Sequence, residues 1–133
     1  MNAATTNIAP STEARTFLER KHQLLIDGQW VAAVSGETTE IFDPATEQHL
    51  ATVAAGGKAD IDRAVAAARK ALRGEWSKLT SYDRTRLILK LADELEANIG
   101  LAGEIETLDN GMPRMVAHYS IASFGCDFLR YYA

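Results

Sequence analysis

The sequence predicts two β-hairpins followed by three α-helices, an arrangement that we expect to be part of a larger fold. Turn-forming Asp-Gly and Asp-Pro pairs interrupt short β-prone segments before residue 57. After residue 58, apolar residues recur at helical spacing, and there is no strand–helix–strand repeat of the kind that builds a parallel sheet. Wide apolar helix faces need further structure to cover them, and the chain stops within the apolar and aromatic stretch 128–133.

The first 21 residues are predicted to be a disordered tail and a short helix. Residues 1–11 are small and polar, so they would bury too little surface to offset the entropy of ordering. The segment Thr12-Glu13-Ala14-Arg15 is typical of a cap and first helical turn, and the helix is expected to end near Lys21. The ordered domain is therefore placed at residues 22–133.

Two hairpins are predicted next. Asp27-Gly28 lies between the apolar runs 24–26 and 30–31 and favours a two-residue turn with positive φ. The second hairpin would pair residues 39–42 with 49–53 through the turn-forming segment Asp43-Pro44-Ala45-Thr46.

Three helices follow the hairpins. The first runs from about Ala59 to Gly74, and the second begins at the capping-box segment 80–83. The apolar pattern of this second helix breaks at Gly100 and Gly103 and then resumes. It ends at the Asn110-Gly111 pair, which suits a left-handed C-terminal cap. The third helix is predicted from Pro113 toward Ala133, with two apolar stripes that suggest burial on two sides.

Composition narrows the possible partners and compartment. The 133 residues, 47% of them hydrophobic, fit one soluble domain. The 18 acidic and 14 basic side chains give a net charge of −4 and form no basic run, which argues against nucleic acid as a partner. Neither a signal peptide nor an apolar span is evident, so we expect neither secretion nor membrane insertion. The single cysteine, Cys126, fits a reducing compartment, and the protein is predicted to be cytoplasmic.

The usual motifs for phosphate and zinc are absent from the sequence, as are Cys-x-x-Cys and His-Glu-x-x-His. The histidines His22, His49 and His118 have no ligand-like spacing and receive no role. Cys126 lies within an apolar helical stripe and is interpreted as a core residue, because nothing nearby would lower the pKa of its thiol.

Three carboxylates in the predicted helix before Asn110 are considered as site residues. Glu104 and Glu106 point to different helical faces and are expected on the solvated surface. Asp109 stays open between a structural and a functional role, since the Asn110-Gly111 terminator does not require its carboxylate.

Several segments, in their order and spacing, resemble the aldehyde dehydrogenase family. Each is common alone, whereas the ordered set is specific and covers nearly everything after residue 21. The segments are Ile26-Asp27-Gly28-Gln29-Trp30, Phe42-Asp43-Pro44-Ala45-Thr46, the helix start 59–65, Leu91-Ala92-Asp93, the motif 106–113 and the closing Leu129-Arg130-Tyr131-Tyr132-Ala133.

The resemblance implies an α/β fold, the Rossmann-like cofactor domain of aldehyde dehydrogenases, of which this chain would cover only the N-terminal part. Complete members use a cysteine thiolate to attack the aldehyde, NAD or NADP to accept the hydride, and a glutamate-activated water to release the acid. Residues for all three steps, and for dinucleotide binding, would lie beyond Ala133. We therefore expect the chain alone to be inactive and to bind no cofactor, and complete members to be homo-oligomers.

The resemblance also assigns two lesser sites to residues of this chain. Ser120 and Phe124 would line the mouth of the aldehyde tunnel, where a phenyl ring favours an apolar or aromatic aldehyde. Asp109, with the backbone carbonyls of Ile41 and Phe42, would hold a structural monovalent cation, since an oxygen-only site with one carboxylate suits a weakly held hard cation.

Two alternatives to a dehydrogenase fragment remain open from the sequence. The chain could be a stand-alone binding or scaffold module that uses uncovered helix faces to hold a partner. It could also be a regulatory fragment that joins intact dehydrogenase subunits.

Overall fold

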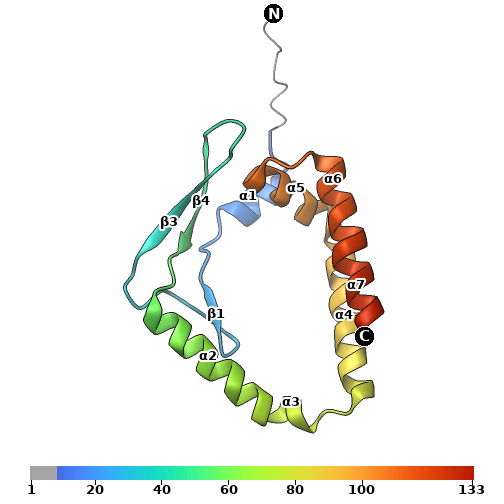
Figure 1. Ribbon diagram of the computed structural model, residues 1–133. Coiled ribbons are helices and arrows are strands. Elements are labelled where there is room, and N and C mark those ends of the chain that lie inside the picture. The colour runs from blue at the N-terminus through green and yellow to red at the C-terminus, as the bar shows by residue number, and fades with distance from the viewer. Residues whose placement is uncertain (1–8) are drawn as a thin grey trace, which may run out of the picture.

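The computed structural model describes residues 9–133, so most of the predicted disordered tail lies outside the described residues. Within that range, both predicted hairpins precede a series of helices (Figure 1). The elements are α1 (Thr12–Leu18), β1 (Leu24–Ile26), β2 (Gln29–Val31), β3 (Thr38–Phe42), β4 (His49–Ala54), α2 (Lys58–Arg73), α3 (Glu75–Lys78), α4 (Ser81–Ala97), α5 (Ile99–Asn110), α6 (Arg114–Ser120), the π-helical η1 (Ile121–Cys126) and α7 (Asp127–Tyr132).

The first hairpin has the turn that its sequence predicts. β1 and β2 are antiparallel, with Ile26 opposite Gln29. The two residues between them, Asp27 and Gly28, have φ of 52° and 75°. Positive φ at both central positions matches the twist of the flanking strands, and Asp-Gly adopts it readily.

The second hairpin is longer than predicted by one residue at each outer end. β3 and β4 pair from Thr38 opposite Ala54 to Phe42 opposite His49, with an irregular register between Ile41 and Phe42. Its turn spans residues 43–48, where the backbone N–H of Asp43 donates to the carbonyl of Gln48.

The short helix α1 begins one residue earlier than the sequence suggests. Ser11, rather than Thr12, is the N-cap, and its hydroxyl oxygen accepts the backbone N–H of Ala14 at 3.1 Å. Ser11 was assigned to the disordered tail. Instead, its backbone N–H and hydroxyl donate to the carboxylate of Glu104 at 2.7 and 2.8 Å.

The predicted starts of the two longest helices are confirmed by their caps. Asp60 is only 2% exposed, and its carboxylate accepts the backbone N–H groups of Gly57 and Val34, so it ties the start of α2 to the loop after β2. Thr80 and Asp83 form the predicted capping box of α4. The four-residue α3 between these helices was not predicted, because one turn is too short to show a period.

The predicted break at Gly100 and Gly103 is wrong. The chain breaks at Asn98, and α5 runs without interruption through both glycines. An ideal Cβ on Gly103 would lie 3.4 Å from the backbone N and Cα of His118, so this glycine permits close packing of α5 on α6. Gly111, with φ of 78°, ends α5 in the predicted left-handed conformation.

The third predicted helix contains a π-helical turn, η1, between α6 and α7. At Gly125 in this turn, an ideal Cβ would lie 3.0 Å from Leu95 Cδ2, so η1 packs tightly on α4. The Arg130 guanidinium donates hydrogen bonds to Glu96 at 2.6 Å and to Asp93 at 3.1 Å, and these bonds raise the pKa of Arg130. These contacts fasten α7 along α4.

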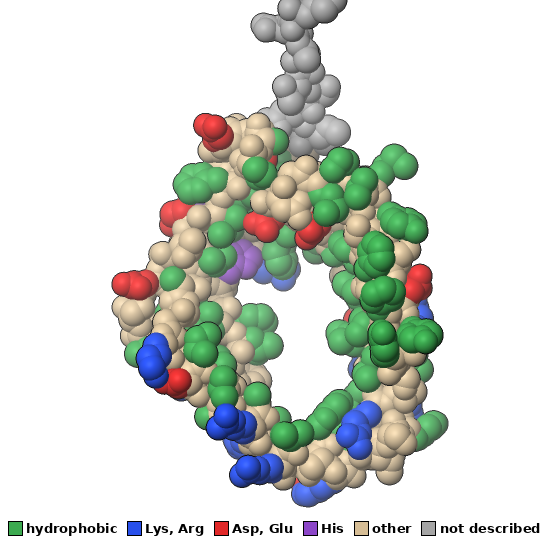
Figure 2. All heavy atoms as spheres, in the orientation of Figure 1, with side chains coloured by type: hydrophobic (Ala, Val, Ile, Leu, Met, Phe, Trp, Pro, Cys, Tyr) green, Lys and Arg blue, Asp and Glu red, His purple; other side chains and the backbone are tan. Residues whose placement is uncertain are grey.

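Together the elements form a ring with an opening through its middle (Figures 1 and 2). The hairpins and α2 make one side, α4 with α6, η1 and α7 the other, α1 and α5 close the top, and α3 lies at the bottom. Hydrophobic side chains gather on the α6–α7 side and around the opening. Among the described residues, no helix combines the length and apolar character required to cross a bilayer.

The core of the ring is small. The buried hydrophobic residues are Ala14, Ile26, Ala33, Ala51, Ala92, Ala117 and Cys126. Most large apolar side chains are exposed instead, including Leu72 at 66% and Met115 at 87%. Five alanines, an isoleucine and a cysteine cannot fill the space between two walls of helices, so the apolar faces remain open to further structure.

Candidate functional site

The hairpin turn of β3–β4 and the end of α5 meet at one corner of the ring. Asp43 is buried, with 8% of the residue exposed. Its carboxylate accepts hydrogen bonds from the backbone N–H of Ala45 and from the hydroxyl of Thr46, each at 2.8 Å. These hydrogen bonds lower the pKa of Asp43 against the opposing effect of burial. An ideal Cβ on Gly111 would lie 3.2 Å from Pro44 Cγ, so the Asp43-Pro44 turn rests against the left-handed cap of α5.

This contact brings two of the three predicted cation ligands to one place. Ile41 of β3 and Asp109 of α5 line the same apolar pocket of about 120 Å³, together with residues of α1 and β4. Phe42, the third predicted ligand residue, does not line it and is 53% exposed. The described residues contain no group of three or more His, Cys, Asp or Glu side chains placed to hold a metal ion. The cation site at Asp109 and the carbonyls of Ile41 and Phe42 therefore stays a prediction.

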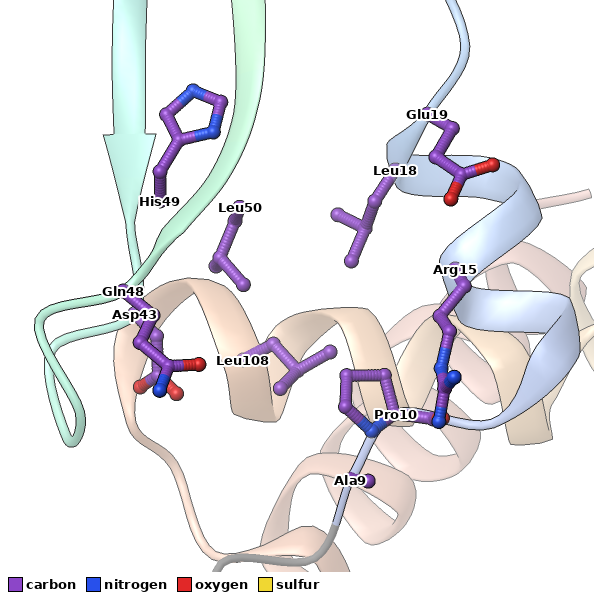
Figure 3. A pocket seen from close by; sticks show the side chains of 10 residues that line it. All are labelled: Ala9, Pro10, Arg15, Leu18, Glu19, Asp43, Gln48, His49, Leu50 and Leu108. Carbon is purple, nitrogen blue, oxygen red and sulfur yellow. The ribbon is translucent and has the colours of Figure 1, made fainter.

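A second pocket, of about 320 Å³, lies beside the first (Figure 3). Leu108 of α5 lies between the hairpin residues and α1, while Arg15 of α1 and Glu19, directly after it, lie across the pocket from His49 and Leu50 of β4. Two of the polar side chains that line it already have partners. Arg15 Nε donates to the carbonyl of Pro10 at 2.9 Å, and His49 Nε2 lies 2.5 Å from Glu40.

The predicted tunnel residues lie where the helix changes its winding. Ser120 is the last residue of α6 and is half-buried, and Phe124 lies in η1 with 60% exposure. The Phe124 ring meets the Phe128 ring edge-on, with centroids 5.6 Å apart. The π-helical turn begins directly after Ser120, which α-helical spacing could not indicate. Their role in substrate access stays a prediction.

Cys126 is confirmed as a core residue, because only 2% of it is exposed. It is the last residue of η1. A thiol must reach the reacting carbon to act as a nucleophile, and a side chain buried as deeply as that of Cys126 does not.

Glu104 was expected on the solvated surface, and this expectation is wrong. The residue is 8% exposed, since its carboxylate turns toward Ser11 and lies 3.7 Å from the Arg114 guanidinium. Burial raises the pKa of Glu104, but the hydrogen bonds from Ser11 and the charge of Arg114 outweigh it, and the net shift is downward. A contact between residues 93 positions apart leaves no trace in local spacing, so the sequence could not reveal it.

The model of the aldehyde dehydrogenase family matches residues 30–133. The chain belongs to this family. Both corner motifs, the Asp43-Pro44 turn and the Asn110-Gly111 cap, lie within the matched range.

Curated aldehyde dehydrogenases resemble the chain over most of its length. Aldehyde dehydrogenase 1 of Tanacetum cinerariifolium is 42% identical over 84% of the chain and 22% of its own length. An aldehyde dehydrogenase of Alternaria alternata is 40% identical over 96% of the chain and 26% of its own length. The chain thus spans about a quarter of these relatives and matches their N-terminal part.

A solved structure supports the same assignment. The NAD⁺ complex of aldehyde dehydrogenase from Bacillus cereus superposes with a TM-score of 0.89 and 40% sequence identity, over 96% of this chain and 26% of that one. The predicted fold class is therefore confirmed: the hairpins and helices are the N-terminal portion of the aldehyde dehydrogenase α/β fold.

Proposed function

We propose that the complete aldehyde dehydrogenase containing this chain oxidises an aldehyde to a carboxylic acid with NAD as the hydride acceptor. The chain itself supplies framework rather than reacting groups. The proposal is supported by the family match and by the relative whose structure was determined as an NAD⁺ complex.

The open ring is the observation that supports a framework role for this chain. Its walls present large apolar side chains to an unfilled space, and its buried core consists mainly of alanines. Surfaces of this kind gain stability when a further layer of structure covers them, at about 25 cal/mol per Å² of apolar area removed from water. The remaining three quarters of the enzyme would provide that layer, and with it the dinucleotide pocket and the catalytic thiol.

The lesser site assignments belong to the same proposal. In the complete enzyme, Phe124 and Ser120 would shape the approach of an apolar aldehyde, and Phe124 is exposed enough to do so. Asp109 and the carbonyls of Ile41 and Phe42 would hold a monovalent cation that braces the corner between β3 and α5. The complete enzyme is proposed to be a cytoplasmic homo-oligomer.

A chimera tests the proposal directly. This chain would replace the matching N-terminal quarter of the Bacillus cereus aldehyde dehydrogenase, and NADH formation would be followed with a series of aldehydes. We expect the chimera to be active, and a Cys126→Ala chimera to be equally active, because the buried thiol takes no part in the chemistry. The 133-residue chain alone is expected to form no NADH.

Two outcomes would contradict the proposal. The first is turnover of an aldehyde, or tight NAD binding, by the chain alone. The second is a chimera that folds and binds NAD⁺ yet loses activity with Cys126→Ala, which would give this thiol a catalytic role. A folded chimera without NAD binding would instead favour a scaffold or regulatory role for the segment.

A further inference from the structure

The Asn110-Gly111 pair that ends α5 is also a chemically labile sequence. The chain has four asparagines, and Asn110 alone is followed by glycine; the residues after the other three are alanine or isoleucine. Glycine has no side chain to obstruct the approach of its backbone nitrogen to the asparagine amide, whereas a β-branched isoleucine obstructs it. Asparagine is already among the thermolabile residues, and the glycine after it removes the main steric barrier to its reaction.

The reaction that this pair undergoes is deamidation, which needs only water and hydroxide as a base. The base removes the proton from the Gly111 backbone nitrogen, which attacks Cγ of Asn110. A bond forms between this nitrogen and Cγ, the Cγ–Nδ2 bond breaks, and Nδ2 leaves as ammonia. Water then opens the cyclic imide. Cleavage at Cγ leaves aspartate, and cleavage at the backbone carbonyl leaves isoaspartate, with no atom oxidised or reduced.

Three hydrogen bonds hold the reacting groups in an unreactive arrangement. The Gly111 N–H, which would have to be deprotonated, donates to the carbonyl of Thr107 at 3.0 Å. The amide under attack is held at both ends. Its Nδ2 donates to the Glu106 carboxylate, and its Oδ1 accepts the backbone N–H of Met112 at 2.8 Å. Asn110 is also the last residue of α5, and closing the imide ring requires its backbone to leave the helical conformation.

The left-handed cap connects these bonds to the corner of the ring. Gly111 has φ of 78°, a conformation in which its N–H points back to the last turn of α5. An ideal Cβ on this glycine would lie 3.2 Å from Pro44 Cγ, so the turn between β3 and β4 rests against the same residue whose nitrogen would attack. The reaction therefore requires local opening of α5 at this contact.

The charge of the aspartate product is unfavourable at this position. The last turn of α5 contains Asp109 and no basic residue. A second carboxylate there would meet the negative end of the helix dipole. It would also lie four residues after Glu106, so a like-charge contact would replace the present hydrogen bond.

The isoaspartate product changes the backbone itself. Its chain runs through the former side chain and is longer by one methylene group, directly before Gly111. The N–H of Gly111 then no longer has the spacing from Thr107 that the left-handed cap requires. Either product therefore weakens the attachment of α5 to the turn between β3 and β4.

We propose that Asn110 is a site of spontaneous deamidation that the left-handed cap of α5 keeps closed while the corner is folded. The reactants are the chain's own amide and water. The reaction takes place in molecules in which the three hydrogen bonds have opened, and the loss of ammonia then hinders their closure. The bonds that control it lie within residues 106–112, so they do not involve the apolar faces of the ring.

Peptide mass spectrometry of the 133-residue chain tests this proposal. The chain would be kept at mildly alkaline pH in native buffer and in urea, and the replacement of –NH2 by –OH would be followed at each asparagine. In urea, Asn110 should react at least about tenfold faster than Asn98, which precedes Ile99. In native buffer, Asn110 should react about ten- to a hundredfold more slowly than in urea, because only the open fraction reacts.

Glu106→Ala removes the acceptor of the Asn110 amide group. It should accelerate deamidation of Asn110 in native buffer by about three- to tenfold and leave the rate in urea unchanged. The matched control is Glu94→Ala, which removes an exposed carboxylate from α4 and changes the net charge equally. The control should react as the parent does, and circular dichroism should show that both variants fold alike.

Asn110→Asp imitates one product without waiting for the reaction. Amide exchange of residues 107–112 should be about three- to tenfold faster in this variant than in the parent. Equal rates of deamidation at Asn110 in native buffer and in urea would overturn the proposal. So would a rate in Glu106→Ala no greater than in Glu94→Ala, a rate at Asn110 in urea no greater than at Asn98, or unchanged exchange in Asn110→Asp.

Discussion

The Glu104→Ala substitution tests whether one buried carboxylate holds α1 in place. The Glu104 side chain receives the backbone N–H and the hydroxyl of Ser11 at 2.7 and 2.8 Å, and Ser11 is itself the N-cap of α1. Alanine removes both acceptor atoms, so α1 loses its main polar attachment to α5.

The expected loss follows from these contacts. A hydrogen bond to a charged group contributes about 1.5–3 kcal/mol, and two such bonds disappear. Ser11 is exposed, so hydrogen bonds to water replace part of the lost free energy. The contact of Glu104 with Arg114, at 3.7 Å, contributes little because the Arg114 guanidinium is open to water. We expect α1 to become less stable by about 2–3 kcal/mol, which corresponds to an increase of roughly 30- to 150-fold in its opening equilibrium.

Hydrogen–deuterium exchange of the amides of residues 12–20, which are α1 and the two residues after it, measures this opening directly, without requiring that the whole chain unfold in one step. The matched control is Glu94→Ala in α4, an exposed carboxylate that makes no side-chain hydrogen bond or ion pair among the described residues. The control should leave exchange in α1 unchanged. Protection of α1 within threefold of the parent in Glu104→Ala would refute the reasoning, because the contact would then contribute less than about 0.7 kcal/mol.

Three further predictions follow from the packing. Gly111→Ala should lower the free energy of unfolding by about 1–2 kcal/mol, measured by thermal unfolding, because φ is 78° and the new Cβ would meet Pro44 Cγ at 3.2 Å. The control is Gly100→Ala, which lies inside a helix, meets nothing within 4 Å and should not destabilise the chain. Equal losses of stability in the two variants would contradict this. The pKa of Glu104 is lowered on folding, so its contribution to the exchange protection of α1 should be complete above pH 4.5, the ordinary pKa of a glutamate, and should decline as the pH falls below that value. Exchange protection of α1 that rises on acidification would contradict this. Cys126 should react with a thiol reagent roughly ten- to a hundredfold more slowly in the native chain than in urea, and equal rates would mean that it is not buried.

Local chemistry was sufficient to predict the hairpins and some of the helix ends, although α1 ends at Leu18 rather than near Lys21. Asp27-Gly28 needs no partner to favour its turn, and the Thr80–Asp83 box and the Gly111 cap act within a few residues. Gly103 shows where local reasoning fails. The sequence interprets it as a break, whereas the fold uses its missing side chain to bring α5 against the backbone of His118.

Contacts between distant segments account for the rest of what the sequence could not predict. The Glu104–Ser11 bond joins residues 93 positions apart, and the contact of Pro44 with Gly111 joins two motifs that are separated by α2 and α4.

The open ring also bears on how such an enzyme is made. In the longer relatives this portion is translated first, and synthesis of the remaining three quarters occupies on the order of tens of seconds. During that interval the nascent ring has helices but little to bury them against, so its apolar side chains stay exposed to water. Synonymous changes that slow translation downstream of this portion would lengthen that vulnerable period and lower the soluble yield, with no change in the mature protein.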